Sequence, residues 1–255
     1  MRILLVEDHT QLANPMAREL EDEHGHTVAI AHDPIEARHL LKRRERFDVA
    51  IIDLLFGPLM ESFDRQRAAH QIVLTRDELL ITGLSAVVDF RRARPNGGVV
   101  LWSSAEANRR LHLLFAYEEL GVRAFCSKSS GTGKADVLNR AAIAAAEGRE
   151  AIDPVIEAYL PPNGSPALRD TILRDQAKRA IWRALALHAY SRQEIRSITG
   201  YAEKTIANLI PAMRADLMTF DPGWRPAKQP LLDVSRYAGD NWQFFLDQAL
   251  LEQYN

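Results

Sequence analysis

The sequence contains a single cysteine, Cys126, among its 255 residues. One cysteine excludes an intrachain disulfide framework and a cysteine-ligated zinc site, and it suits a reducing compartment. Uninterrupted apolar runs are also lacking, since none approaches the roughly 20 residues that a membrane-spanning helix needs. The first residues have the pattern of a buried strand rather than that of a secretory signal peptide. We therefore expect a cytoplasmic protein that has no membrane partner.

A large excess of charge of one sign is missing as well. The formal net charge is −2 at pH 7, so the overall composition does not indicate nucleic acid, and any basic surface must be local. Hydrophobic residues make up 47% and charged residues 26% of the chain, which is typical of globular proteins rather than disordered ones. The length is comfortable for two domains.

Strand and helix patterns alternate over the first 150 residues. Five apolar runs predict strands, and they read RILLVE, HTVAIA, FDVAIIDLL, GGVVLWSS and VRAFCSK. Helix patterns separate them, and one of these helices begins with Asp33 as its N-cap and Pro34 at its first position. This alternation predicts an α/β fold with a doubly wound, five-stranded parallel sheet of the flavodoxin type, in the strand order 2-1-3-4-5.

One connection in this pattern is unusually long, because about 45 residues separate the third predicted strand from the fourth. Thr75 and Glu78 have the spacing of a capping box, and an apolar stripe follows at Leu80, Leu84, Val87 and Val88. These features predict one long helix over residues 75–95. Residues 54–74 then form a long insertion beside Asp53, and whether it is functional or disordered stays open.

A helical region follows the predicted sheet. We divide the chain into a sheet domain over 1–148, a linker over 149–167, an all-α domain over 168–220 and a C-terminal extension over 221–255. In the all-α domain, Ser191 caps a short helix that ends at Gly200, and a brief turn leads to a second helix. This spacing is that of a helix-turn-helix. In the extension, the stretch NWQFFLDQALLEQY predicts one terminal amphipathic helix.

Polar residues stand where the predicted strands end. Glu7 and Asp8 follow the first strand, and Asp53 follows the third, which is its neighbour in this strand order. Three carboxylates at one sheet edge suit a hard cation such as Mg²⁺, which would offset their mutual repulsion. Ser104 ends the fourth strand and Lys128 the fifth, so the same edge carries a hydroxyl donor and an ammonium. Together these groups predict a site for a phosphoryl group.

The blocks LLVEDH, IIDLL, LWSSAEA and FCSK resemble the receiver domain of two-component response regulators. The block YSRQEIRSITGYAEKTIANLI resembles the helix-turn-helix of LuxR-type proteins. The whole layout is similar to the NarL/LuxR class of response regulators over residues 1–150 and 168–217. The insertion after Asp53 departs from that family, in which this loop is about 20 residues shorter.

This resemblance implies roles for the residues at the strand ends. Asp53 would accept a phosphoryl group from a sensor histidine kinase, which makes the chain a phosphoprotein rather than an enzyme acting on a separate substrate. Asp8 would bind Mg²⁺ directly and Glu7 through water, while the backbone carbonyl of Leu55 would add another ligand. The remaining roles are a hydrogen bond from Ser104 to a phosphoryl oxygen, pairing of Lys128 with the phosphoryl group and a switch role for the aromatic Phe125.

The resemblance also implies a transcription regulator that binds DNA as a homodimer. The expected DNA contacts lie on and around the second helix of the helix-turn-helix, at Arg192, Lys204, Thr205, Asn208 and Arg214. Pro211 lies inside that helix, where it removes a backbone donor and should kink or weaken the helix.

Several alternatives stay open at this stage. Asp53 could remain unmodified in an atypical receiver that responds to a ligand or a protein, and the helical domain could bind protein instead of DNA. A phosphohydrolase that uses Asp53 as its nucleophile is disfavoured, because no second aspartate stands two residues further on. The histidines His9, His24, His26, His32 and His39 show no metal-ligand spacing and are expected at the surface.

Overall fold

The computed structural model describes residues 1–43, 46–57, 61, 80–104, 106–129, 134–161, 164–227 and 229–254. Of the predicted insertion over 54–74, only residues 54–57 and 61 are described, and Thr75 and Glu78 lie outside the described residues. Within the described ranges, no helix combines the length and the apolar character needed to cross a membrane.

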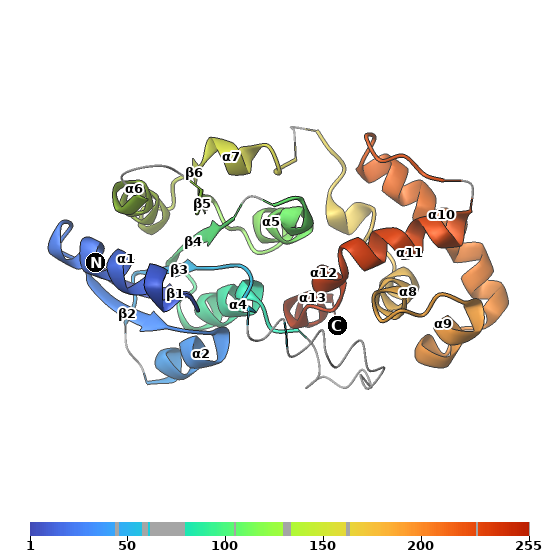
Figure 1. Ribbon diagram of the computed structural model, residues 1–255, viewed down its shortest axis with the longest axis horizontal. Helices are drawn as coiled ribbons and strands as arrows, with labels where there is room; N and C mark the ends of the chain where they lie inside the picture. Colours follow the sequence, from blue (N-terminus) through green and yellow to red (C-terminus); the bar gives the residue numbers. More distant parts are fainter. Residues whose placement is uncertain are drawn as a thin grey trace.

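A parallel sheet forms the first part of the chain, with the strand order β2-β1-β3-β4-β5-β6 (Figure 1). Its strands are β1 (Arg2–Val6), β2 (Thr27–Ala31), β3 (Val49–Ile52), β4 (Gly98–Ser103), β5 (Ala124–Ser127) and β6 (Ala151–Ile152). The predicted fold class and the order of the first five strands are confirmed. The sixth strand was not predicted, because its two residues pair with β5 but are too few to give an apolar run.

Helices cover both faces of this sheet, as a doubly wound fold requires. One face is covered by α1 (Thr10–Asp22) and α6 (Lys134–Ala146), and the other by α2 (Pro34–Lys42), α4 (Gly83–Ala93) and α5 (Arg110–Glu118). All residues of β3 and β4 are buried, which explains their uninterrupted apolar sequences. The Asp33 side chain accepts a hydrogen bond from the backbone N–H of Glu36 and caps α2 as predicted.

The predicted long helix over residues 75–95 is wrong in its start, because α4 begins only at Gly83. Leu80 is instead extended and forms a parallel β-bridge with Asp247. Thr82 is the N-cap of α4, and its hydroxyl oxygen accepts a hydrogen bond from the backbone N–H of Leu84 at 3.1 Å. The backbone at Leu80 thus pairs with a partner from the far end of the chain, and this overrides the local helix pattern.

Gly83 brings the start of α4 directly against the end of β3. Its backbone N–H donates to the carbonyl of Leu54 at 2.8 Å. A Cβ atom at this position would lie only 2.0 Å from the carbonyl oxygen of Asp53. The close approach of helix and strand therefore requires glycine here.

Three helices form the core of the all-α domain, and they are α8 (Gln176–Ala186), α9 (Arg192–Thr199) and α10 (Glu203–Phe220). Short elements connect this domain to the sheet, namely α7 (Pro154–Glu157) and the 3₁₀ turn η3 (Leu168–Asp170). Ser191 forms a capping box with Glu194, and Gly200 ends α9 with a φ of 75°, as the sequence predicts. The helix α10 continues through Pro211 without interruption, so the expected weakening does not end it.

The last part of the chain, residues 242–254, lies between the sheet and the all-α domain (Figure 1). The helix α11 (Pro230–Asp240) is followed by α12 (Trp242–Phe245) and α13 (Gln248–Tyr254). The prediction of one terminal helix is wrong, because it breaks at Leu246 and Asp247. There the backbone pairs with Leu80, which donates to the Leu246 carbonyl at 3.0 Å and accepts from the Gln248 N–H at 2.9 Å.

We call residues 242–254 the C-terminal strap. Its helix α12 packs on α8, and its helix α13 packs on α4. Phe245 stacks on Trp182 of α8 with ring centroids 4.9 Å apart, while Phe244 meets Phe115 of α5 edge to face at 5.9 Å. The strap therefore joins the cores of the two domains.

Candidate phosphoryl-acceptor site

Glu7, Asp53 and Lys128 meet at the carboxyl edge of the sheet. Glu7 directly follows β1, and Asp53 directly follows β3, which is paired with β1 in parallel register. The Lys128 ammonium, carried by the residue after β5, lies 2.6 Å from Glu7 Oε2 and 2.8 Å from Asp53 Oδ2. The structure thus brings together these three residues as the strand-end pattern predicts.

The positive group between these two carboxylates is the Lys128 ammonium itself. From the sequence, we expected a metal ion to relieve the repulsion between the acidic residues. The lysine side chain is 17% exposed, and those of Glu7 and Asp53 are 0% and 3% exposed. The ammonium also lies 5.4 Å from the centre of the Trp102 ring, a cation–π contact that the sequence analysis missed. Trp102 appeared there only as an apolar strand residue, so nothing marked it as part of the site.

Burial dominates the protonation behaviour of Asp53. It raises the pKa of this carboxyl from 3.8 to about 6, although the neighbouring Lys128 charge opposes the rise. The repulsion from Glu7 adds a smaller increase, and the backbone N–H of Leu54 donates to Asp53 Oδ1 at 2.7 Å. The site therefore combines a desolvated carboxyl group with a cation beside it, an arrangement that suits a nucleophilic carboxylate.

Asp8 lies beside this trio and offers a place for a divalent cation. The ligand atoms of Glu7, Asp8 and His9 all lie within 4.8 Å of one another. Glu7 Oε2 and Asp8 Oδ1 are buried and accept no hydrogen bond, although the Lys128 ammonium lies 2.6 Å from the first oxygen and His9 Nδ1 lies 2.9 Å from the second. Carboxylate oxygens of this kind suit Mg²⁺. Glu7 and Asp8 therefore fit a magnesium ion, and the predicted role of Asp53 as a further ligand stays a prediction.

His9 was expected to be a surface residue without a role. Its side chain is 70% exposed, but its Nδ1 lies 2.9 Å from Asp8 Oδ1 and 3.2 Å from Glu7 Oε1. The signal in the sequence was the run of three residues of metal-ligating type, from Glu7 to His9. The scatter of the five early histidines over helices and loops hides this short run.

Among the described hydrogen bonds, none joins the Asp53 side chain to Ser104, Phe125 or Leu55. The Ser104 hydroxyl donates to Glu106 Oε1 at 3.0 Å. Phe125 is fully buried in β5, where its ring centroid lies 6.3 Å from that of Tyr117. Leu55 lies two residues beyond Asp53 and is buried. The roles of these residues remain predictions.

In the all-α domain, the predicted DNA contacts divide into two groups. Arg192, Lys204, Thr205 and Asn208 are exposed on α9 and on the first turns of α10. Arg214 is placed differently, because its Nε lies 2.9 Å from the buried carboxylate of Asp233 and its Nη2 donates to the Ala227 carbonyl at 2.6 Å. This guanidinium is held by its own chain, and its predicted contact with DNA stays a prediction.

A second buried carboxylate lies where the strap meets the sheet. The Thr82 hydroxyl donates to Asp247 Oδ2 at 2.5 Å, and the Ala249 N–H donates to Asp247 Oδ1 at 2.8 Å. His112 of α5 is also fully buried, with its Nε2 3.8 Å from Asp247 Oδ2. Burial raises the pKa of Asp247 to about 7. Burial, helped by the Arg109 charge, lowers the pKa of His112 to about 3, so this imidazole is neutral.

The strand order and the acidic sheet edge with its lysine agree with the doubly wound fold and the strand-end pattern that the sequence predicts. A response regulator of the LuxR family from Aurantimonas sp. SI85-9A1 is 23% identical with a TM-score of 0.46, covering 62% of this chain and 93% of that one. A CheY-like receiver domain protein from Methanospirillum hungatei JF-1 is 20% identical with a TM-score of 0.42, covering 58% and 94%.

A third similar structure is the response regulator TrrA of Thermotoga maritima in complex with Mg²⁺-BeF, which is 17% identical with a TM-score of 0.38, covering 55% of this chain and 96% of that one. No family model and no curated protein sequence matches the chain. At these values, a likeness transfers no activity, ligand or partner to this protein.

Proposed function

We propose that this protein is a response regulator in which Asp53 accepts a phosphoryl group from a sensor histidine kinase. The observation that supports this most directly is the ammonium of Lys128, which touches Asp53 and Glu7 at the edge of a parallel sheet. Such an arrangement offers a nucleophilic carboxylate and a fixed positive charge, and phosphoryl transfer needs little more than placement and charge neutralisation.

In the proposed reaction, an Asp53 carboxylate oxygen attacks the phosphorus of a phosphohistidine. The P–N bond breaks, its electron pair stays on the imidazole nitrogen, and an acyl phosphate forms on Asp53. Lys128 keeps its contact with Glu7 and neutralises charge on the incoming group. Magnesium, held by Glu7 and Asp8, would supply further positive charge to the phosphoryl oxygens. Ser104 reaches these oxygens only after its hydroxyl leaves Glu106.

We further propose that the exposed start of α10 binds DNA. Lys204, Thr205 and Asn208 lie on its first turns, and Arg192 lies at the start of the preceding helix. These side chains offer a cation and hydrogen-bonding groups at the place where a helix-turn-helix meets base edges and phosphates. The C-terminal strap covers one face of α4. A homodimer on a two-fold DNA site would therefore either form through another surface or form only after the strap has left α4.

The phosphorylation proposal is tested with acetyl phosphate and MgCl₂, followed by intact mass measurement. We expect the wild-type chain to gain one phosphoryl group, and we expect Asp53→Asn to gain none. Omission of MgCl₂ should slow the gain strongly. An unmodified wild-type chain, or an equal gain in Asp53→Asn, would overturn the proposal.

The DNA-binding proposal is tested by titrating wild type and Lys204→Ala with a random-sequence duplex at several salt concentrations. We expect the logarithm of the affinity to fall linearly with the logarithm of salt concentration, and the slope to shrink by about one unit in the variant. The matched control is Arg18→Ala, since Arg18 is exposed on α1 in the other domain. Binding without salt dependence, or equal slopes for all three chains, would favour a protein-binding role of the helical domain.

A further inference from the structure

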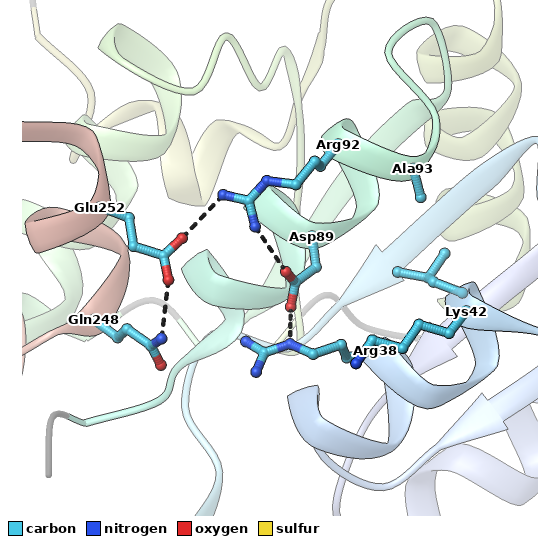
Figure 2. Close-up of a pocket in the computed structure, with 8 residues that line it drawn as sticks. Arg38, Lys42, Asp89, Arg92, Ala93, Gln248 and Glu252 are labelled. Atoms are coloured by element: carbon cyan, nitrogen blue, oxygen red, sulfur yellow. Dashed lines mark hydrogen bonds and ion pairs between the residues drawn. The ribbon is translucent and has the colours of Figure 1, made fainter. Parts of the chain in front are cut away.

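A pocket of about 430 Å³ lies where the C-terminal strap meets the sheet domain, between α2, α4 and α13 (Figure 2). Its polar lining consists of Arg38 and Lys42 from α2, Asp89 and Arg92 from α4, and Gln248 and Glu252 from α13. The volume is within the range of small-molecule sites in proteins. The pocket is separate from the acidic edge at Asp53, since none of the site residues lines it.

The carboxylates of this pocket are already engaged (Figure 2). Asp89 accepts from Arg38 Nε at 2.6 Å and from Arg92 Nη1 at 3.4 Å. Glu252 accepts from Arg92 Nη2 at 3.1 Å and from the Gln248 side-chain amide at 2.9 Å. Arg92 thus links α4 to the strap, and both acidic groups have their partners.

The cations on the α2 side are only partly used. In the described part of the chain, the ion pair of Arg38 with Asp89 is made through Nε, and its two terminal amino groups point across the pocket toward Gln248 (Figure 2). Among the described residues, no carboxylate forms an ion pair with the Lys42 ammonium. The pocket therefore has three cations for two carboxylates, and the unused donors lie on one wall.

We propose that this pocket binds a small molecule with an oxyanion, either a phosphate or a carboxylate. The oxyanion would pair with Arg38, whose terminal amino groups form a planar fork, and with Lys42 beside it. A hydroxyl or amine of the same molecule would donate to the side-chain oxygen of Gln248 on the opposite wall. The ligand would then bridge α2 of the sheet domain and α13 of the strap.

Such a ligand favours the attached state of the strap. Since Gln248 and Glu252 belong to α13, the pocket is complete only while α13 lies on α4. A molecule that binds one state of an equilibrium stabilises that state by its binding free energy. Binding of this ligand requires no phosphorylation of Asp53, and it acts on the strap that joins the two domains.

The probes for the test are sodium phosphate, ribose 5-phosphate and citrate, compared with sodium chloride at equal ionic strength. We expect at least one probe to raise the thermal midpoint of the full chain in a saturable manner. Lys42→Gln, which leaves the Arg38–Asp89 pair intact, should weaken the apparent affinity by about tenfold. Arg38→Gln combined with Lys42→Gln should abolish the effect, whereas Arg18→Gln on the opposite face of the sheet should preserve it.

Hydrogen exchange on the same samples tests the bridge to the strap. We expect the bound probe to slow exchange in α13 more than in α1. No saturable shift with any probe, an unchanged affinity in the double variant, or unchanged exchange in α13 would overturn the proposal. Asp53→Asn should bind the probe with the affinity of the wild-type chain. This variant separates the two proposals, because binding of the probe does not depend on phosphorylation of Asp53.

Discussion

Asp53 and Asp247 are two buried carboxylates of one chain, and their surroundings differ in one respect. Burial raises the pKa of both, to about 6 for Asp53 and about 7 for Asp247. Asp53 faces the Lys128 ammonium, which is partly exposed at the sheet edge. Asp247 faces a hydroxyl, a backbone N–H and a neutral imidazole, and no cation lies within ion-pair distance among the described residues.

Under the proposed function, this difference separates a phosphoryl acceptor from a structural carboxylate. Desolvation makes both groups more basic, so a raised pKa does not identify a functional site by itself. The cation beside Asp53 can stabilise additional negative charge, and its own side chain is partly exposed. The Thr82 hydroxyl at the start of α4 instead ties the strap to that helix through Asp247. Four changes would break or sharpen this comparison, and they are given from the largest expected effect to the smallest.

Lys128→Met should have the largest effect, because it removes the cation shared by Asp53 and Glu7 and leaves two buried carboxylates side by side. Removal of one partner of a buried ion pair costs about 3–5 kcal/mol. We expect the free energy of unfolding, measured in urea at pH 8, to fall by this amount. Lys204→Met removes an exposed lysine and should change it by less than ~0.5 kcal/mol. Equal values for the two variants would contradict a buried role for Lys128.

The titration of Asp247 should appear in the pH dependence of stability. Its pKa is higher in the folded chain than its ordinary value of 3.8, so its contribution to stability is complete below about pH 4 and is lost as the pH rises toward about 7. Asp247→Asn cannot titrate. The unfolding free energy of wild type, minus that of the variant, should therefore fall on the order of 3 kcal/mol between pH 4 and pH 8.

His112 is the natural confounder of that measurement, since its lowered pKa gives the opposite slope between about pH 3 and pH 6.5. Both chains keep His112, so its contribution cancels in the difference. A difference that does not change with pH would show that Asp247 titrates normally and is not desolvated.

Thr82→Val should have an intermediate effect, because this hydroxyl both donates to Asp247 and caps α4. The loss of a buried hydrogen bond and of a helix cap should reduce the unfolding free energy by about 2 kcal/mol. Thr82→Ser keeps the hydroxyl and should cost less than half as much. A larger loss in Thr82→Ser than in Thr82→Val would mean that the methyl group, rather than the hydroxyl, stabilises this junction.

Asp53→Asn should have the smallest effect on stability and should act in the opposite direction. The amide removes a carboxylate whose pKa is raised by burial, while Lys128 keeps Glu7 as its partner. We expect the unfolding free energy at pH 8 to rise by about 1 kcal/mol. A loss of several kcal/mol would place Asp53 among the structural carboxylates, together with Asp247.

The same two regions show what the sequence could predict. The site at Asp53 could be predicted because each of its residues follows a strand, and parallel strands end at one edge of the sheet. Local pattern and strand order then suffice to bring Glu7, Asp53 and Lys128 together. The identity of the bridging cation was not accessible, because it depends on how far the Lys128 side chain reaches.

The region around Asp247 could not be predicted, because its partner Thr82 lies 165 residues away in the chain. The bridge between Leu80 and Asp247 explains both wrong helix predictions. It keeps Leu80 extended, so α4 starts late, and it interrupts the terminal helix between α12 and α13. In each case, a long-range backbone pairing overrides a local apolar period that is correct for burial, since Leu80 and Leu84 are both buried.

The contact at Gly83 connects Asp53 and Asp247 through the backbone at the start of α4. One neighbour in sequence, Thr82, holds Asp247, and the glycine N–H holds the residue after Asp53. Gly83 has no side chain that could fill space between α4 and the end of β3. A rearrangement of the peptide after Asp53 must therefore either break the Gly83–Leu54 hydrogen bond or tilt α4. A tilt of α4 would act on the strap through the hydrogen bond between Thr82 and Asp247. Only a few covalent bonds and two hydrogen bonds therefore separate the proposed phosphorylation site from the contact between the two domains.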